Sequence, residues 1–129
     1  MNTLVSFELA KLLKEEGFDL PVCNVFETSM LHGRECYFFE KEYELDKHNK
    51  QDGENTNYYS RPTIAEVVMW LYEKHQIWIE TPFWDSKFRI KVVDIKNETV
   101  LKGIDFNQFN TPTEAYEEAI KYTLKNLIP

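Results

Sequence analysis

The sequence predicts an α+β fold in which an antiparallel sheet carries helices on one face. Apolar residues recur at helical spacing in three segments, 3–16, 62–75 and 112–127. Between the second and third helices, three short segments alternate apolar and polar residues, as half-buried strands do. We therefore expect the C-terminal half to run α-β-β-β-α. We expect the N-terminal half to supply a helix and one or two strands that pack against it.

The first helix is expected over 3–16. Either Thr3 or Ser6 can cap its first turn, because a hydroxyl oxygen accepts hydrogen bonds from free amides at a helix start. Gly17 suits the left-handed position after the helix, and Phe18 can then fold back onto it. The expected apolar stripe consists of Val5, Leu9, Leu12 and Leu13.

Residues 20–34 are ambiguous: Pro21 to Phe26 can form a strand, and Met30 to Arg34 look like a loop with Gly33 as its turn. Residues 35–45 alternate and predict a strand with one buried and one solvated side. Lys41 interrupts the apolar side, which is typical of edge strands. The expected buried side consists of Tyr37, Phe39, Tyr43 and Leu45. The expected solvated side consists of Glu40, Glu42 and Glu44.

Residues 46–57 contain no hydrophobic side chain and predict a flexible loop. A chain of 129 residues is expected to form a single domain. Within it, we expect a helix and strand unit over 1–45, a polar loop over 46–60 and the α-β-β-β-α unit over 61–129. The first unit is too small to bury a core comfortably by itself, so it is expected to pack against the second.

The second helix is expected to begin with Pro62 in its first turn and a capping box formed by Thr63 and Glu66. Strands are expected over 77–80, 88–95 and 99–106. The last helix is expected to begin at Thr111 and Pro112 and to bury one face, which consists of Tyr116, Ala119, Ile120, Thr123, Leu124 and Leu127.

The net charge of −7 is concentrated in the first half of the chain. Residues 1–60 carry 6 Lys and Arg against 12 Asp and Glu, a net charge of −6. Such a surface disfavours phosphates and anionic lipids and favours basic protein surfaces. The sequence shows no secretory leader and no membrane-spanning run, so we expect a cytoplasmic protein. In that compartment Cys23 and Cys36 are expected to be reduced, buried thiols.

Three blocks of sequence resemble one family. They are AKLLKEEGF at 10–18, PTIAEVVMWLYEKHQIWIE at 62–80 and TPTEAYEEAIKYTL at 111–124, about a third of the chain. They look like small uncharacterised proteins encoded in prophages and mobile elements of anaerobic gut bacteria. The resemblance implies a phage or mobile-element origin. It implies no activity, cofactor or catalytic residue.

A second resemblance is to topology alone. The α-β-β-β-α order is that of double-stranded-RNA-binding domains, which grip RNA through phosphate and 2′-hydroxyl contacts. That family places lysines where this last helix begins, whereas this chain has Glu114, Glu117 and Glu118 there. Carboxylates repel phosphates, so nucleic acid is not the expected partner.

Cys23, His32, Cys36 and His48 are the side chains with metal-ligand chemistry in the first half. Zinc sites generally have two cysteines two to four residues apart, whereas here the two cysteines are thirteen positions apart. We therefore expect no metal, no cofactor and no enzymatic activity. A metal-binding or enzymatic protein that uses Cys23, His32 and Cys36 is the alternative.

Aromatic residues gather in the second half, and Trp78 alternates with Ile77 and Ile79 on the opposite strand face. Either the N-terminal unit covers that face, which we favour, or Trp78 and Trp84 form an exposed binding patch. The sequence thus predicts a non-enzymatic accessory protein that acts through protein–protein contacts, with a basic partner or a second copy of itself. Its candidate surface consists of Trp78, Trp84, Glu40, Glu42 and Glu44.

Overall fold

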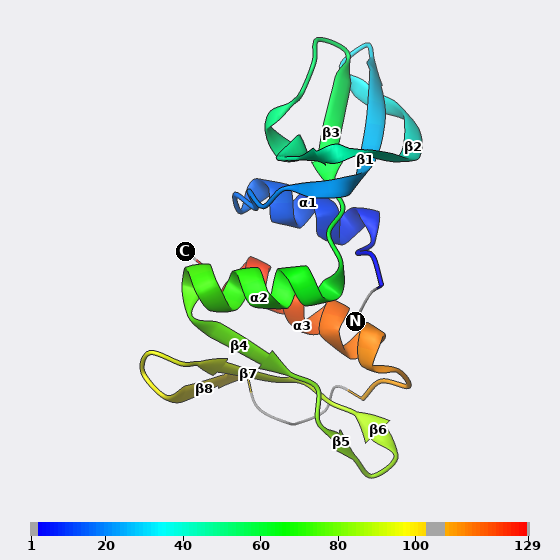
Figure 1. The fold of residues 1–129 in the computed structure, drawn as a ribbon. Helices are drawn as coiled ribbons and strands as arrows, with labels where there is room; N and C mark the ends of the chain where they lie inside the picture. Colours follow the sequence, from blue (N-terminus) through cyan, green and yellow to red (C-terminus); the bar gives the residue numbers. More distant parts are fainter. Residues whose placement is uncertain (1–2, 103–107, 129) are drawn as a thin grey trace. The chain divides into compact units, whose positions relative to one another are not determined.

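The computed structural model describes residues 3–102 and 108–128, apart from the side chain of Tyr37. It confirms the predicted α+β class: three α-helices accompany antiparallel sheets (Figure 1). The chain divides into two compact units. Leu4–Pro62 form the N-terminal unit, and Thr63–Pro129 with Met1–Thr3 form the C-terminal unit.

The N-terminal unit is a three-stranded antiparallel sheet with one helix. Its elements in chain order are α1 (Phe7–Glu15), β1 (Val22–Leu31), β2 (Arg34–Asp46), the 3-10 helix η1 (His48–Lys50) and β3 (Thr56–Ser60). The strand order is β2-β1-β3, so β1 is central and β2 is an edge strand. The core of this unit consists of Val5, Leu9, Ala10, Leu13, Phe18, Val22, Val25, Phe26 and Tyr59.

Both ends of α1 follow the predicted capping chemistry. Ser6 is the N-cap, and its hydroxyl oxygen accepts a hydrogen bond from the Leu9 amide at 3.3 Å. Gly17 has φ +84°, and the amide of Phe18 donates to the Leu13 carbonyl at 2.9 Å. This pattern is a Schellman motif, which closes the helix where the sequence predicted. The helix begins at Phe7 rather than at residue 3.

The ambiguous segment 20–34 is mostly strand. β1 continues through Leu31, and a two-residue turn of His32 and Gly33 leads directly into β2. Both turn residues have positive φ angles, 53° and 77°, which is the type I′ geometry that matches the twist of a β-hairpin. The turn at Gly33 is therefore confirmed, while the loop reading is wrong because these residues pair as strands.

The predicted flexible loop over 46–57 is an ordered part of the N-terminal unit. Asn49 explains how a segment without hydrophobic side chains is held. Its side-chain oxygen accepts from the Ser60 amide at 2.7 Å, and its side-chain nitrogen donates to the Phe18 carbonyl at 3.0 Å. His48 is buried, with ring nitrogens 2.8 Å from Gln51 Oε1 and 3.0 Å from the Glu44 carbonyl. Hydrogen bonds replace apolar burial here.

The C-terminal unit places two helices on one face of a second antiparallel sheet (Figure 1). Its elements are α2 (Ile64–His75), β4 (Ile77–Glu80), β5 (Phe83–Trp84), β6 (Lys87–Phe88), β7 (Lys91–Asp94), β8 (Thr99–Lys102) and α3 (Pro112–Asn126). The main sheet has the order β4-β7-β8, and β5 and β6 pair as a separate hairpin. The predicted α-β-β-β-α order is thus present, with one hairpin inserted between its first two strands.

The three strands predicted for the C-terminal unit agree with the structure only in part. The strand over 77–80 is confirmed as β4, whereas the one over 88–95 is shorter as β7 and the one over 99–106 is described only to Lys102. The rest of that last prediction lies outside the described residues. The buried face of α3 consists of Ala115, Ala119, Ile120, Thr123 and Leu124, while Tyr116 and Leu127 are half-buried.

The capping box of α2 is confirmed. Thr63 Oγ1 accepts from the Glu66 amide at 3.2 Å, and Glu66 Oε1 accepts from the Thr63 amide at 2.9 Å. Pro62 lies before the cap rather than in the first turn. We predict that Thr63→Ala lowers the unfolding free energy by about 1 kcal/mol, because the Glu66 amide loses its side-chain acceptor. Urea denaturation of the variant checks this, with Thr99→Ala in an exposed strand as the control; equal stabilities would contradict it.

Candidate functional site

A β-bulge in β2 produces the most structured polar cluster of the N-terminal unit. The pairing of β1 with β2 shifts between Ser29 and Met30, so that Tyr37 faces Ser29 but Glu35 faces Met30. Cys36 is the extra residue. Simple alternation would place Glu35 on the strand side that bears Phe39. The bulge instead turns Glu35 to the side of Thr28, as bulges commonly re-aim a side chain.

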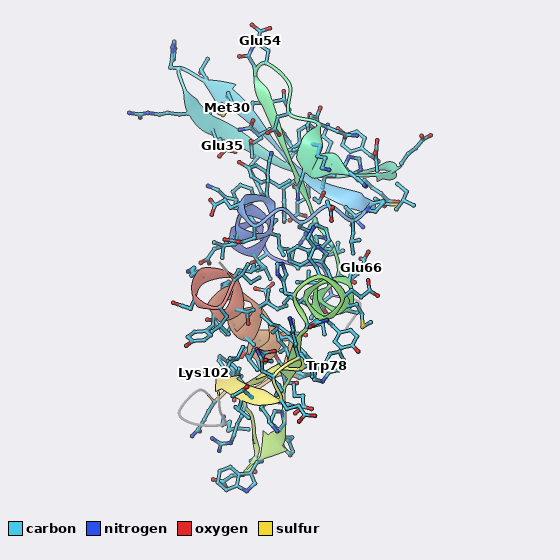
Figure 2. All side chains as sticks on the ribbon, turned by 90° about the vertical axis from the view of Figure 1, so that its left-hand side faces the viewer. Met30, Glu35, Glu54, Glu66, Trp78 and Lys102 are labelled. Carbon is cyan, nitrogen blue, oxygen red and sulfur yellow. The ribbon has the colours of Figure 1, made fainter. Side chains whose placement is uncertain are left out.

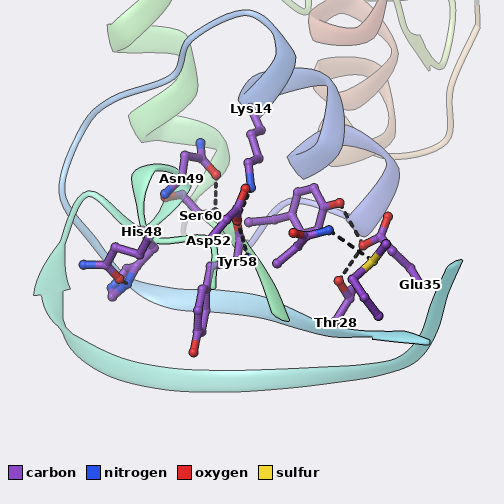
Figure 3. Close-up of polar contacts among 12 residues, drawn as sticks. Lys14, Thr28, Glu35, His48, Asn49, Asp52, Tyr58 and Ser60 are labelled. Atoms are coloured by element: carbon purple, nitrogen blue, oxygen red, sulfur yellow. Dashed lines mark hydrogen bonds and ion pairs between the residues drawn. The ribbon is translucent and has the colours of Figure 1, made fainter. Parts of the chain in front are cut away.

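The Glu35 carboxylate lies beside Thr28 (Figure 3) and is also contacted by Tyr59 and Lys11. The Thr28 hydroxyl donates to Oε2 at 2.5 Å, and the Tyr59 hydroxyl donates to the same oxygen at 2.8 Å. Lys11 Nζ lies 3.8 Å from Oε1. Thr28 and Tyr59 are buried, whereas the side chain of Glu35 is 27% exposed. One carboxylate oxygen therefore accepts from two hydroxyls, Lys11 lies near the other, and the Asn57 side chain also hydrogen-bonds to this carboxylate.

This arrangement keeps Glu35 ionised and Tyr59 protonated. Burial alone would raise the pKa of the Glu35 carboxyl, but the hydrogen bonds from Thr28 and Tyr59 and the charge of Lys11 outweigh it and lower the pKa below 4.5. Burial raises the pKa of the Tyr59 phenol well above 10, and its hydrogen bond to Glu35 raises it further. The phenol is therefore a fixed donor, and the carboxylate is a fixed anion at neutral pH.

The lowered pKa of Glu35 predicts an acid-sensitive contribution to stability. A carboxyl whose pKa is lower in the folded state stabilises the fold above its unfolded value of 4.5, and the contribution is lost as the pH falls through the folded value. Glu35→Gln should therefore be less stable than wild type at pH 7 and lose less stability between pH 5 and 3. Urea denaturation across that range measures it. Parallel pH profiles for the two proteins would contradict the assignment.

A cavity of about 370 Å³ opens beside the cluster and is lined by Phe7, Thr28, Glu35, Cys36 and Phe38. Phe7 and Phe38 meet with ring centroids 4.7 Å apart and form its aromatic wall. Cys36 is exposed and Cys23 is half-buried, so the expectation of two buried thiols is wrong. The cause is again the bulge, because the extra residue has no opposing neighbour to cover it. The lining thus combines one anion with aromatic surface.

The second side of β2 corrects the sequence prediction. Phe39, Tyr43 and Leu45 were expected to be buried, yet they are 48%, 39% and 66% exposed. The reason is position: they lie on the face opposite α1, on an edge strand, where Tyr43 is covered only in part by the His48 and Tyr58 rings, 5.9 Å and 6.2 Å away. The side chain of Tyr37 lies outside the described part. The solvated character of the three glutamates, Glu40, Glu42 and Glu44, is confirmed.

The β2 surface therefore combines two stripes, which we define as Phe39, Tyr43 and Leu45 on one side and Glu40, Glu42 and Glu44 on the other. Within the apolar stripe, Tyr43 donates to Glu27 Oε2 at 2.9 Å. Within the acidic stripe, Glu40 lies 3.5 Å from Arg61, whose guanidinium stacks 4.4 Å above the Phe26 ring. Most of the acidic stripe remains available to another cation.

The two candidate tryptophans lie in different places of the C-terminal unit. Trp78 in β4 (Figure 2) is half-buried, and its ring meets the ring of Tyr72 in α2 edge-on, with the centroids 5.7 Å apart. Trp84 in the β5–β6 hairpin is 65% exposed and stacks on the Arg89 guanidinium at 4.6 Å. Trp78 thus belongs to the main sheet, whereas Trp84 belongs to a hairpin that the sequence did not predict.

The metal alternative named Cys23, His32 and Cys36, which occupy the start of β1, the hairpin turn and the bulge of β2. Within 3–102 and 108–128, no three His, Cys, Asp or Glu side chains are gathered as metal ligands are.

At the start of α3, Glu114, Glu117 and Glu118 line a cavity of about 480 Å³ together with Phe109 and Thr113.

Sequence reasoning missed Glu35, Thr28 and Tyr59 as a group. Tyr59 pairs opposite Phe26 across β1, and only strand register brings it near Glu35. A strand over 22–31 with a turn at Gly33 would have placed Thr28 near Glu35, but nothing in the residue pattern indicates the bulge.

Among the described helices, none has the length and apolar character that crossing a membrane requires.

Comparison with known proteins adds no relative: no protein-family model, no curated protein and no solved structure matches this chain.

Proposed function

We propose that the protein is a non-enzymatic accessory protein that binds a basic protein partner through β2. The partner segment adds as an extended strand to the free edge of β2. The single observation that carries this proposal is an edge strand of 13 residues that exposes an apolar and an acidic stripe together. Strand addition to a sheet edge is a common mode of peptide recognition.

The length and composition of this edge are unusual. Proteins generally keep edge strands short or place charges and bulges on them to prevent association. β2 has a bulge near Cys36, a second register shift within 43–45 and one central lysine, Lys41, but the stretch from Phe38 to Leu45 presents four exposed apolar side chains. They are Phe38, Phe39, Tyr43 and Leu45. An exposed apolar stripe of this kind marks interaction surfaces.

The two stripes define the partner. Side chains directly opposite in paired strands lie on the same face and interact. A strand added to β2 therefore places one set of its side chains against Glu40, Glu42 and Glu44, and the alternate set against Phe39, Tyr43 and Leu45. Lysine or arginine alternating with apolar residues satisfies both. The net charge of −6 over residues 1–60 attracts the same class of segment over longer distances.

A peptide selection tests the proposal. The full-length protein is immobilised and exposed to a random peptide library at low salt, and bound peptides are sequenced. We expect enrichment of segments in which Lys or Arg alternates with apolar residues. Binding should weaken about tenfold or more when Glu42 and Glu44 are both replaced by Lys, because attraction becomes repulsion. It should also weaken as salt rises.

The matched control reverses two glutamates elsewhere, Glu114→Lys with Glu118→Lys on α3. These charges are exposed but lie in the C-terminal unit. Equal loss of binding in both double variants would show that net charge alone drives the association. Selection of peptides without basic residues, or of none, would reject β2 as a basic-strand site.

A further inference from the structure

We propose that the cavity beside Glu35 is a binding site for a guanidinium group and receives an arginine side chain from the bound segment. The inference rests on the proposed function for the source of the arginine. The cavity itself is argued from its own residues: an anion, an aromatic wall and an open position. Figure 2 places Glu35 next to Met30 on the β1–β2 hairpin.

The first requirement of the site is an anion in a fixed orientation, which the Glu35 carboxylate supplies. Thr28 and Tyr59 both donate to Oε2 of Glu35, and the Asn57 side chain also hydrogen-bonds to this carboxylate, so its orientation is fixed. The nearest cation to Oε1 is Lys11 at 3.8 Å, whose side chain is 45% exposed. A distance of 3.8 Å is too long for a strong charge-assisted hydrogen bond. Oε1 can therefore accept from a second cation without displacing a buried partner.

The wall of the cavity suits a flat cation. Phe38 is 46% exposed although it stacks on Phe26 at 5.0 Å, so part of its ring is free to contact a ligand. Guanidinium groups stack on aromatic faces and are more weakly hydrated than ammonium groups, so they lose less on entering such a site. A cavity of about 370 Å³ is large enough for an arginine side chain.

The same unit already contains this recognition pattern once. Arg61 stacks its guanidinium 4.4 Å above the Phe26 ring and lies 3.5 Å from Glu40. The cavity offers the same combination, a phenylalanine face and a carboxylate, on the same face of the sheet. In the cavity, Phe38 takes the role that Phe26 has beside Arg61, and Glu35 takes the role of Glu40. Among the described residues that line the cavity there is no arginine.

The cavity lies on a face of β2 that side chains of the proposed added strand can reach. Phe38 and Glu40 lie on the face of β2 that Thr28 and Phe26 share, as their pairing shows. A segment added along β2 points every second side chain to that face. Its basic residues, which oppose the acidic stripe, are the ones that pass the mouth of the cavity. One of them can turn into it.

Single-residue probes test the cavity without any peptide. The full-length protein, labelled with nitrogen-15, is titrated with N-acetyl-arginine N-methylamide, and amide shifts are followed by NMR. We expect weak binding, with a dissociation constant of about 1–10 mM, as for a ligand of this size. Shifts should concentrate at Thr28, Glu35 and Phe38. The neutral isostere N-acetyl-citrulline N-methylamide should bind at least about tenfold more weakly, because it lacks the charge.

Variants sharpen the assignment. Glu35→Gln should weaken arginine binding about tenfold or more, and Lys11→Met should strengthen it by removing the competing cation. Glu54→Gln, in an exposed loop of the same unit, should change nothing. If Glu35→Gln fails to fold, two measurements still test the proposal. They are the difference between arginine and citrulline binding to the wild-type protein and the increase in arginine affinity of Lys11→Met.

Several results would overturn the proposal. They are equal binding of arginine and citrulline, shifts that map away from the cavity, and no shifts at the highest soluble concentration. Equal affinity for N-acetyl-lysine N-methylamide, titrated in the same way, would overturn the guanidinium assignment. The two proposals fail separately. A basic peptide that binds β2 while free arginine does not removes the cavity alone, whereas arginine binding without any selected peptide removes strand addition alone.

Discussion

Replacing Phe26 by Ala should lower the unfolding free energy of the N-terminal unit by about 3–5 kcal/mol, the usual cost of deleting a buried phenylalanine. Phe26 is 1% exposed and contacts the rings of Phe7 at 5.3 Å and Phe38 at 5.0 Å. The Arg61 guanidinium also stacks on it. Its loss leaves a cavity under the aromatic wall and an unstacked cation, so both the core and the arginine site should weaken.

Hydrogen exchange measured by mass spectrometry reports this unit separately. Amides of β1 that exchange only through unfolding should exchange at least about a hundredfold faster in Phe26→Ala. Phe83→Ala is the matched control, since that ring is 64% exposed in the β5–β6 hairpin and its loss should cost under about 0.5 kcal/mol. Unchanged exchange in β1 of the Phe26 variant would contradict the described core.

In the C-terminal unit, Leu71→Ala should cost about 2–5 kcal/mol. Leu71 is fully buried on the face of α2, and the other buried residues of that helix are Ile64, Val67, Val68 and Trp70. All three tryptophans of the chain belong to this unit, so tryptophan fluorescence during denaturation follows it directly.

Met69→Ala is the control for Leu71, because Met69 lies on the same helix with 44% of its surface exposed. It should lower stability by no more than about 0.5 kcal/mol. Equal midpoints for the two variants would show that α2 does not bury the face described.

Local chemistry made the helices predictable. Ser6, Gly17 and the Thr63–Glu66 pair act within four residues of the helix end they close, so the sequence alone places them. The helix boundaries shifted by a few residues, as fraying ends do. The same locality explains why the turn at Gly33 was foreseeable: a two-residue hairpin turn depends on its own φ angles.

The candidate site was less predictable because it depends on contacts distant in sequence. Glu35 reaches Tyr59 only through the register of three strands, and the bulge at Cys36 reverses the side that alternation assigns to Glu35. Likewise, alternation located the apolar stripe of β2 but could not decide whether anything covers it. The ordered segment around Asn49 was missed because side-chain hydrogen bonds leave no hydrophobic pattern.

The central claim is that a basic segment pairs with β2, and hydrogen exchange in a complex tests it most directly. A peptide recovered in the selection is bound to the full-length protein, and exchange is compared with and without it. The account predicts slower exchange of amides in residues 38–46, because those on the free edge gain partners, with no change in residues 83–88 of the exposed hairpin. Protection confined to 83–88, with β2 unchanged, would contradict it.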